Sequence, residues 1–149
     1  MQKAIKKEVR LIKIRPNIVG DIMVDLDVSI IGKEVDFSND DLTMLDEYYK
    51  HIGCDCIDIT SFGGIYNPKG YSVVVDDEGL LKSGNLVMAY TLPIEGENIT
   101  LELAGTILIG KSDYVENKDF DGLYEVGLSD SDIEYIKEHL SVRLLGLTR

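Results

Sequence analysis

The sequence predicts an α+β domain with a mostly antiparallel sheet, two main helices and an N-terminal β-hairpin. Two segments repeat apolar residues at helical spacing behind a residue that can cap a helix. Short β-rich runs lie between these segments, and most of the turns that separate them are too short to hold a crossover helix. Near the N-terminus, apolar residues alternate with acidic ones, which predicts a half-buried strand.

The 149 residues fit a single domain, 1–149, because this length is typical of one hydrophobic core. Within it, we expect residues 1–37 to form a hairpin extension and residues 38–146 to form the α+β core. The sequence contains no internal repeat and no low-complexity linker.

The predicted hairpin joins a basic segment to an acidic one. Residues 3–15 place Ile, Val and Leu between cations and end at the turn signal Arg15-Pro16-Asn17. Residues 21–30 alternate, with aliphatic side chains on one face. Antiparallel pairing brings cations of the first segment near carboxylates of the second, which is mildly stabilising. The residues concerned are Arg10, Lys13, Arg15, Asp21, Asp25 and Asp27.

Ser38-Asn39-Asp40-Asp41 predicts the start of the first helix. Ser38 can accept a hydrogen bond from a free backbone amide, and the two aspartates complement the positive end of the helix. Gly53 is expected to end it. The apolar residues at helical spacing between these points are Leu42, Leu45, Tyr49 and Ile52.

The second helix is predicted by the same kind of pattern. Ser129 is the expected cap, with Asp130 and Asp132 in the first turn. We expect this helix to continue as far as Gly146. The apolar residues that share one helical face are Ile133, Ile136, Leu140 and Leu144.

Five β-rich runs between the helices predict the sheet. Their bounds are 57–62, 71–75, 86–92, 99–103 and 106–109. Turn-forming clusters separate them, including residues 76–79, Leu92-Pro93 and residues 95–98. Residues 111–122 are polar and charged and follow neither periodicity, so we expect a mobile loop there.

The net charge of −12 is unevenly distributed. Residues 1–15 carry +5 and the remaining chain carries −17. A mostly acidic surface repels phosphates, which argues against direct nucleic-acid binding. The basic arm could instead touch a polyanion, or the acidic surface could imitate one. Charge pairing within the hairpin and solubility explain the same charges without any partner.

Cysteine usage and hydropathy favour a soluble protein of the cytoplasm. Cys54 and Cys56 are too close in sequence for an ordinary structural disulfide, and no signal-peptide pattern precedes the first strand. No window reaches the roughly 18 to 20 apolar residues that a membrane span requires. We therefore expect no membrane association.

The sequence predicts no metal site and no cofactor. His51, Cys54 and Cys56 are possible zinc ligands, but the remaining ligand would have to come from the distant His139. A calcium loop with Gly122 at its sixth position fails, because Leu128 occupies the twelfth position, where a glutamate is required. We expect His51 to lie at a helix C-terminus and at least one cysteine to be buried.

The sequence also argues against catalysis. It contains no nucleophile elbow, no zinc-protease motif, no phosphate-binding P-loop and no dinucleotide fingerprint. With two histidines, acid–base chemistry would depend on carboxylates, and these show no paired spacing. We expect a protein that is not an enzyme.

Five local features follow one another in a recognisable order. They are a helix that ends before Gly53, a short strand through Ile57 and Ile59, Asp77-Glu78-Gly79-Leu80-Leu81 followed by Asn85, Gly105-Thr106, and Gly127-Leu128-Ser129-Asp130. Over about residues 40–145, this order resembles a family of small phage and mobile-element proteins of unknown function. The N-terminal hairpin exceeds the short strand expected in that family, and such an addition can offer an edge to a partner strand or a ligand.

Most of these shared features are explained by structural roles, such as shaping turns and starting helices. We expect Gly79 to supply the positive φ of a tight turn and Gly105 to permit a bulge or a close backbone approach. Asn85 follows Gly84 in a polar turn, where asparagine usually bonds nearby backbone. Contact with a ligand is the alternative role for Asn85.

A candidate ligand site lies between Phe62 and Tyr71. This segment combines glycine amides, the cation Lys69 and aromatic rings, which can stack on a base and hold a phosphate. A hairpin turn whose rings cover the core is the structural alternative. The candidate ligand-binding residues are Tyr66, Asn67, Lys69, Tyr71 and Asn85.

The resemblance and this segment together give a functional hypothesis. We expect a homo-oligomeric phage or mobile-element accessory protein, paired through strand edges, that binds and neutralises a host factor in the host cytoplasm. The first candidate is a nucleotide-type immune signal held in pockets between subunits. The alternative is a host protein that the acidic surface inhibits by imitating DNA.

Overall fold

The computed structural model describes residues 6–19, 23–36, 44–64, 67, 69–82, 84–116 and 121–148. It has the predicted α+β fold, with mostly antiparallel sheets that begin with a β-hairpin. In chain order, the elements are β1 (Lys6–Val19), β2 (Met23–Asp36), α1 (Leu45–Ile52), β3 (Ile57–Phe62), β4 (Tyr71–Asp76), β5 (Leu86–Ile94), β6 (Glu97–Ala104), β7 (Ile107–Gly110), β8 (Ser112–Glu116), β9 (Asp121–Glu125), α2 (Asp130–His139) and β10 (Ser141–Leu147).

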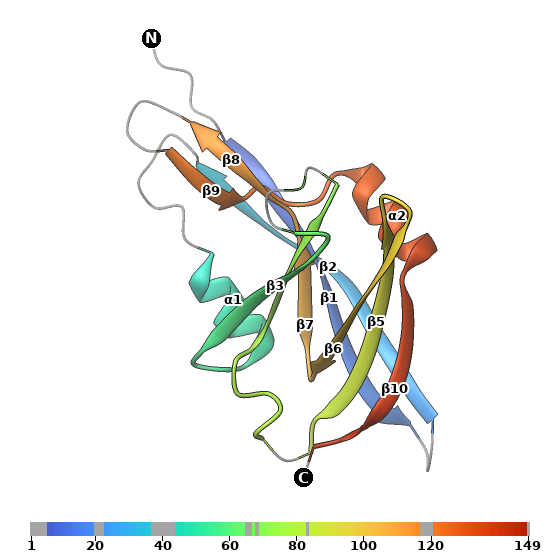
Figure 1. Ribbon diagram of the computed structural model, residues 1–149. Coiled ribbons are helices and arrows are strands. Elements are labelled where there is room, and N and C mark those ends of the chain that lie inside the picture. Colours follow the sequence, from blue (N-terminus) through green and yellow to red (C-terminus); the bar gives the residue numbers. More distant parts are fainter. Residues whose placement is uncertain are drawn as a thin grey trace.

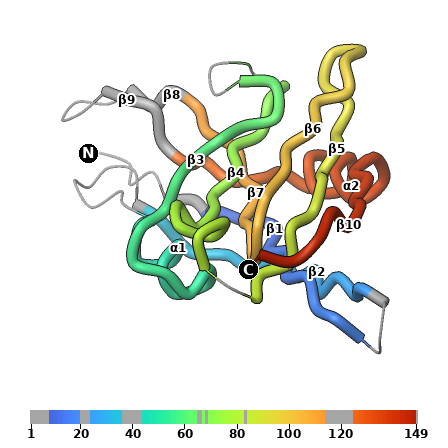
Figure 2. The backbone as a smooth tube through the Cα atoms, turned by 60° about the horizontal axis from the view of Figure 1, so that its bottom comes forward, coloured from blue at the N-terminus to red at the C-terminus, as the bar shows by residue number. Residues whose placement is uncertain are grey.

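The described strands form three antiparallel sheets (Figure 1). The five-stranded sheet has the order β2-β1-β7-β4-β3, and the three-stranded sheet has the order β10-β5-β6. The strands β8 and β9 form a separate two-stranded ladder. In Figure 2, α1 and α2 lie on opposite sides of the five-stranded sheet. The middle of that sheet is therefore covered on both faces.

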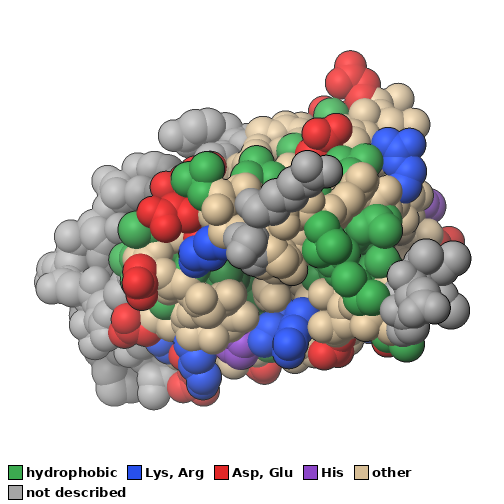
Figure 3. Space-filling view, turned by 90° about the horizontal axis from the view of Figure 1, so that it is seen from below, with side chains coloured by type: hydrophobic (Ala, Val, Ile, Leu, Met, Phe, Trp, Pro, Cys, Tyr) green, Lys and Arg blue, Asp and Glu red, His purple; other side chains and the backbone are tan. Residues whose placement is uncertain are grey.

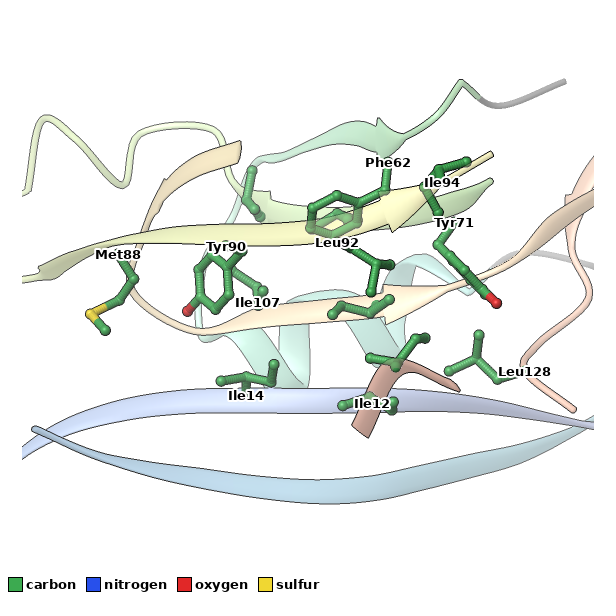
Figure 4. Packing of buried hydrophobic residues seen from close by; sticks show 14 of the residues in the cluster. Ile12, Ile14, Phe62, Tyr71, Met88, Tyr90, Leu92, Ile94, Ile107 and Leu128 are labelled. Carbon is green, nitrogen blue, oxygen red and sulfur yellow. The ribbon is translucent and has the colours of Figure 1, made fainter. Parts of the chain in front are cut away.

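The larger core fills the space between the five-stranded and three-stranded sheets. Figure 4 shows Ile12 and Ile14 of β1 facing Tyr90 and Leu92 of β5 across this space. The tyrosine Tyr90 points from β5 toward β1, and its buried hydroxyl has no hydrogen-bond partner among the described residues. The helix α2 covers one side of this core with Ile136.

A smaller core lies on the opposite face of the five-stranded sheet. It contains Val9 and Leu11 of β1, Leu108 of β7, and Met44 and Tyr48 beside and within α1. Neighbouring residues of one strand thus point into different cores, as an extended backbone requires. Runs such as Val73-Val74-Val75 and Ile107-Leu108-Ile109 are apolar without alternation for this reason.

The hairpin of β1 and β2 is longer than predicted. Arg15-Pro16-Asn17 is not its turn, because β1 continues through these residues and pairs Pro16 with Leu26. Arg15 lies opposite Asp27, as expected, whereas Arg10 forms its ion pair with Asp130 of α2 at 2.7 Å. Because β1 and β2 pair without interruption along their whole length, Pro16 lies inside a strand and not in a turn.

The first helix ends as predicted and begins later than predicted. The residue Gly53 ends α1 in the left-handed conformation, with φ of +75°, and its N–H donates to the Tyr49 carbonyl. The helix begins at Leu45 after Met44, which supplies no side-chain cap. The predicted cap Ser38 and its aspartates lie outside the described residues.

The second helix begins as predicted, but its predicted end is wrong. The Ser129 hydroxyl accepts a hydrogen bond from the Asp132 N–H, and the Asp132 carboxylate accepts one from the Ser129 N–H, which is a capping box. The helix ends at His139, with Leu140 as its C-cap, instead of continuing to Gly146. Residues 141–147 form β10, because pairing with β5 satisfies the backbone of both strands.

Two other predictions about connections are wrong. Leu92-Pro93 does not end a strand, because β5 runs to Ile94 and the turn falls at Glu95-Gly96. Residues 111–122 are not a loop throughout, because residues 112–116 and 121–125 pair as β8 and β9. Residues 117–120 lie outside the described part of the chain.

Neither helix in the described ranges is long and apolar enough to cross a membrane. His51 lies in the last turn of α1 as predicted, 3.5 Å from the Glu47 carboxylate. The prediction that a cysteine is buried is wrong, because Cys54 is half-buried and Cys56 is exposed.

Candidate functional site

A hollow of about 360 Å³ lies where β4, β5 and α2 meet, and we call it the tyrosine–lysine hollow. Its lining combines two aromatic rings, two ammonium groups and two carboxylates. The lining residues are Lys69, Tyr71, Pro93, Ile94, Glu95, Lys111, Asp132 and Tyr135. Two residues that the sequence analysis singled out, Lys69 and Tyr71, are therefore brought to one site.

The centre of the hollow is a contact among Tyr71, Lys111 and Asp132. The Tyr71 hydroxyl donates a hydrogen bond to Asp132 Oδ1 over 3.0 Å. The Lys111 ammonium lies 4.8 Å from the centroid of the Tyr71 ring and 3.6 Å from Asp132 Oδ1. Burial of the Tyr71 hydroxyl and its bond to Asp132 raise the pKa of this tyrosine. The ring therefore stays neutral and offers its face to a cation.

The capping box of α2 fixes Asp132. Burial alone would raise the pKa of this carboxyl, but hydrogen bonds from Ser129 and Tyr71 and the nearby Lys111 hold the pKa below its usual value. Asp132 is therefore ionised at neutral pH. One carboxylate oxygen serves the start of the helix and the other serves the hollow.

The register of the five-stranded sheet places Lys111 beside Tyr71. Ser72 of β4 lies opposite Gly110 of β7. Tyr71, which precedes Ser72, and Lys111, which follows Gly110, are therefore neighbours. The backbone of Lys111 is held as well, because its N–H donates to Glu125 Oε1 over 2.8 Å and its carbonyl accepts from the Val126 N–H. The ammonium group is thus carried on a fixed backbone position.

The rest of the lining comes from α2 and the end of β5. The Tyr135 hydroxyl donates to the carbonyl of Pro93, which joins the helix to the strand. Glu95 follows in a tight turn and has φ of +51°, the conformation that a two-residue hairpin turn demands. Pro93 and Ile94 thus add apolar residues to a lining that otherwise includes charged groups.

Behind Lys111, on the opposite face of the sheet, Glu125 occupies a polar cluster. Its carboxylate accepts hydrogen bonds from Ser72 Oγ at 2.9 Å, from Ser112 Oγ at 3.2 Å and from the Lys111 N–H. A Cβ at Gly110 would lie 1.6 Å from Glu125 Oε1, so glycine alone leaves room for the carboxylate. The Tyr48 hydroxyl also bonds this carboxylate.

Burial raises the pKa of Glu125 from 4.5 to about 7, although the hydrogen bonds that it accepts act in the opposite direction. The same cluster raises the pKa of Tyr48, through burial first and through Glu125 second. Glu125 therefore titrates near neutral pH, on the face of the sheet opposite the Lys111 ammonium.

The other predicted ligand-binding residues are placed differently. Asn67 lies beside the hollow, but its side chain is engaged: Nδ2 donates to the Gly63 carbonyl and to Glu95, and Oδ1 accepts from the Lys69 N–H. It shapes the loop that carries Lys69. The predicted contact Tyr66 lies outside the described residues.

Asn85 lies at the opposite end of β5, roughly 25 to 30 Å from Ile94 at the usual rise per strand residue. Its Nδ2 donates to the Gly79 carbonyl over 2.9 Å, and its backbone pairs with Thr148. It lines a second hollow of about 360 Å³ together with Gly105, Thr106 and Arg15. The structure therefore does not bring Asn85 to the site of Lys69 and Tyr71.

The two glycines of the resemblance have different roles. Gly105 has φ of +75°, a conformation that favours glycine, whereas a Cβ there would meet only the Asn85 side chain at an ordinary contact distance of 3.6 Å. The expectation of a positive φ at Gly79 is wrong. A Cβ at Gly79 would lie 3.2 Å from the Asp76 carbonyl and 3.3 Å from the Ala104 carbonyl, so a larger residue would require these backbone groups to shift by a few tenths of an ångström.

An acidic groove of about 470 Å³ separates the edges of β3 and β6. The exposed carboxylates of Asp58, Asp77 and Glu102 stand around it, while Asp76 is paired with Lys82 at 2.6 Å. Leu101 and Leu103 of β6 supply apolar surface within it. Among the described residues, no group of three or more His, Cys, Asp or Glu side chains could hold a metal ion.

Sequence reasoning missed Lys111, Asp132 and Tyr135 as members of the site. Asp132 was identified as a residue of the helix start, which is half of its role. Lys111 was placed in a loop, and its isolated position gave no motif. The usable signal in the sequence was the apolar run Ile107-Leu108-Ile109, because a strand there places Lys111 just beyond its end.

No protein-family model matches this chain, and comparison with curated proteins and with solved structures likewise finds no matching protein. The resemblance to a phage and mobile-element family therefore stays a prediction.

The replacement Glu125→Gln should flatten the dependence of stability on pH. With the pKa raised, protonated Glu125 supports the folded state below about pH 4.5, and this support is lost as the pH rises to about 7. The shift corresponds to about 3 kcal/mol. Urea unfolding at pH 4 to 8 should show that the difference between variant and parent changes across this window. Exposed Glu134→Gln is the control, and parallel curves for Glu125→Gln and the parent would show that Glu125 titrates normally.

Proposed function

We propose that this chain is a non-enzymatic binding protein that captures a small, anionic, aromatic ligand of the nucleotide type in the tyrosine–lysine hollow. The observation that carries the proposal is the Lys111 ammonium held over the Tyr71 ring in a hollow that also contains Lys69 and Tyr135. Ammonium groups bind phosphate as point charges, and the half-buried Tyr135 ring can stack on a base, while the buried Tyr71 ring positions Lys111.

The chemistry of the lining fits such a ligand in three ways. Lys69 is exposed and Lys111 is half-buried, so one ammonium can move to a phosphate while the other is already positioned. Ile94 and Pro93 provide an apolar surface for a planar ring. The ionised Asp132 can accept hydrogen bonds from the amino groups of a base.

The arrangement supports capture more than reaction. Asp132 is occupied by the capping box and by Tyr71, and Glu125 is enclosed by its hydroxyl and amide donors on the other face of the sheet. A group that acts as an acid or base must reach the substrate. We propose that the captured ligand is a host signal and that the protein acts in the host cytoplasm as a phage or mobile-element accessory factor.

The acidic groove favours a second candidate function, which is the inhibition of a basic host protein. Asp58, Asp77 and Glu102 project beside the edges of two strands, and each of them is exposed. A strand edge can bind an extended segment through its backbone, and carboxylates favour a segment rich in Lys or Arg.

Calorimetry with a panel of nucleotides tests the first function. The probes are mononucleotides, 3′,5′-cyclic mononucleotides, cyclic dinucleotides and inorganic phosphate. At least one nucleotide should bind, and Lys111→Met should weaken it by roughly tenfold or more, because one charge-assisted contact is lost while the aliphatic stem remains. Lys69→Ala should weaken binding as well. Lys137→Ala on the exposed side of α2 is the matched control. An absence of heat with every probe, or equal binding by Lys111→Met, rejects the hollow as the site.

Competition with DNA tests the second function. The protein should displace labelled DNA from a small basic DNA-binding protein, and the effect should fall steeply as salt is added. A triple variant, Asp58→Asn with Asp77→Asn and Glu102→Gln, should lose most of this activity. A second triple variant, Asp46→Asn with Glu134→Gln and Glu138→Gln, removes the same charge from the helices and should keep it. Equal loss in both triple variants would mean that net charge alone is responsible and that the groove has no special role.

A further inference from the structure

The strand β2 presents a long free edge. It spans residues 23–36, pairs with β1 along its whole length, and is the last strand on its side of the five-stranded sheet. The register with β1 has no shift, and no proline falls within β2. Natural edge strands are protected by such interruptions or by charged side chains, and β2 has only the charges, which can pair with opposite charges on another strand. This edge is therefore available to another strand.

Some apolar side chains of β2 are exposed, and some of its charged side chains lack an ion-pair partner among the described residues. Val28 and Ile30 are 44% and 40% exposed, although they lie on the same face as the buried Ile12 and Ile14 that they pair with. On the other face, Asp25 is exposed and Lys33 is half-buried. Among the described residues, neither Asp25 nor Lys33 has an ion-pair partner.

We propose that β2 pairs antiparallel with β2 of a second copy of this chain, with Ser29 of both copies at the two-fold axis. In this register, Val28 lies opposite the partner's Ile30 on one face, and Asp25 lies opposite the partner's Lys33 on the other. Each of these contacts occurs twice, because the two copies are related by a two-fold axis. Apolar and oppositely charged cross-strand pairs both stabilise a ladder.

The neighbouring registers fit less well. Moving the axis to Ile30 keeps an opposite-charge pair, Asp27 with the partner's Lys33, but places Val28 opposite the partner's Gly32, so the two apolar pairs are replaced by a single contact at the axis. Moving it to Val28 places Asp27 opposite the partner's Ser29, and Asp25 loses its cation. The self-complementarity of the strand is what selects a second copy as the partner, because an unrelated strand would have no reason to match both faces at one register.

The lower end of the molecule adds apolar surface beside this edge. Seen from below, a group of hydrophobic side chains is exposed on this face of the molecule (Figure 3). The exposed hydrophobic residues include Ile18 and Val19 at the end of β1, next to the start of β2 in the ladder. Joining two β2 strands would unite two five-stranded sheets into one and extend the interface past a single ladder.

Sedimentation and disulfide cross-linking of the full chain test the proposal. The parent for cross-linking carries Cys54→Ser and Cys56→Ser. Sedimentation should give twice the mass of 16.6 kDa. The replacement Ser29→Cys should form a covalent dimer under mild oxidation, since directly opposite residues lie about 4.5 to 5.5 Å apart between Cα atoms. Asp27→Cys is the matched control, because its two copies would be roughly 13 Å apart along the strand. A monomer at the highest soluble concentration, or cross-linking of Asp27→Cys as fast as Ser29→Cys, overturns the proposal.

A charge swap separates pairing from a general loss of stability. The replacement Lys33→Asp turns both attractive pairs into repulsive ones and should raise the dimer dissociation constant by about tenfold. Adding Asp25→Lys to Lys33→Asp restores opposite charges and should return the constant close to that of the parent. If the double variant dissociates as readily as Lys33→Asp alone, these residues do not face each other and the register is wrong.

Discussion

Burial of both faces of β1, β7 and β4 is the constraint on which the structure depends. Each of these strands sends alternate side chains into two different cores, one shared with the three-stranded sheet and one shared with α1. In β7, all four residues from Ile107 to Gly110 are buried. A sheet in this position cannot slip by one residue, because a slip would exchange the contents of the two cores.

This fixed register places the chemistry of the candidate site. Tyr71 at the start of β4 and Lys111 after β7 are neighbours because Ser72 lies opposite Gly110. The ammonium of Lys111 faces Tyr71 and Asp132, and its backbone N–H holds Glu125 on the other face. The hollow and Glu125 thus lie on opposite faces of the sheet, at the place where β4 pairs with β7. A proposed nucleotide-type ligand would meet groups whose positions are set before it arrives, which lowers the cost of binding.

Local signals in the sequence were sufficient for part of this structure. Ser129 and Asp132 predicted a helix start, Gly53 predicted a helix end, and the runs 57–62 and 71–75 predicted strands at nearly their observed bounds. The end of α2 could not be predicted, because Leu140 and Leu144 fit a helical face and pairing with the distant β5 decides the outcome. For the same reason, the local composition between Phe62 and Tyr71 predicted Lys69 and Tyr71 as site residues, whereas Lys111 and Tyr135 join the site only through tertiary structure.

Hydrogen exchange of the backbone amides tests the central constraint most directly. If both faces of β1, β7 and β4 are buried, the amides paired within residues 9–14, 72–75 and 107–110 should exchange only when the whole domain unfolds, with one common free energy. The outward-facing amides of the edge strand β3 and the amides at the ends of α1 should exchange much faster. Rapid exchange within 107–110, or a free energy of opening for β1 far below that of β4, would contradict the account of a central sheet covered on both faces.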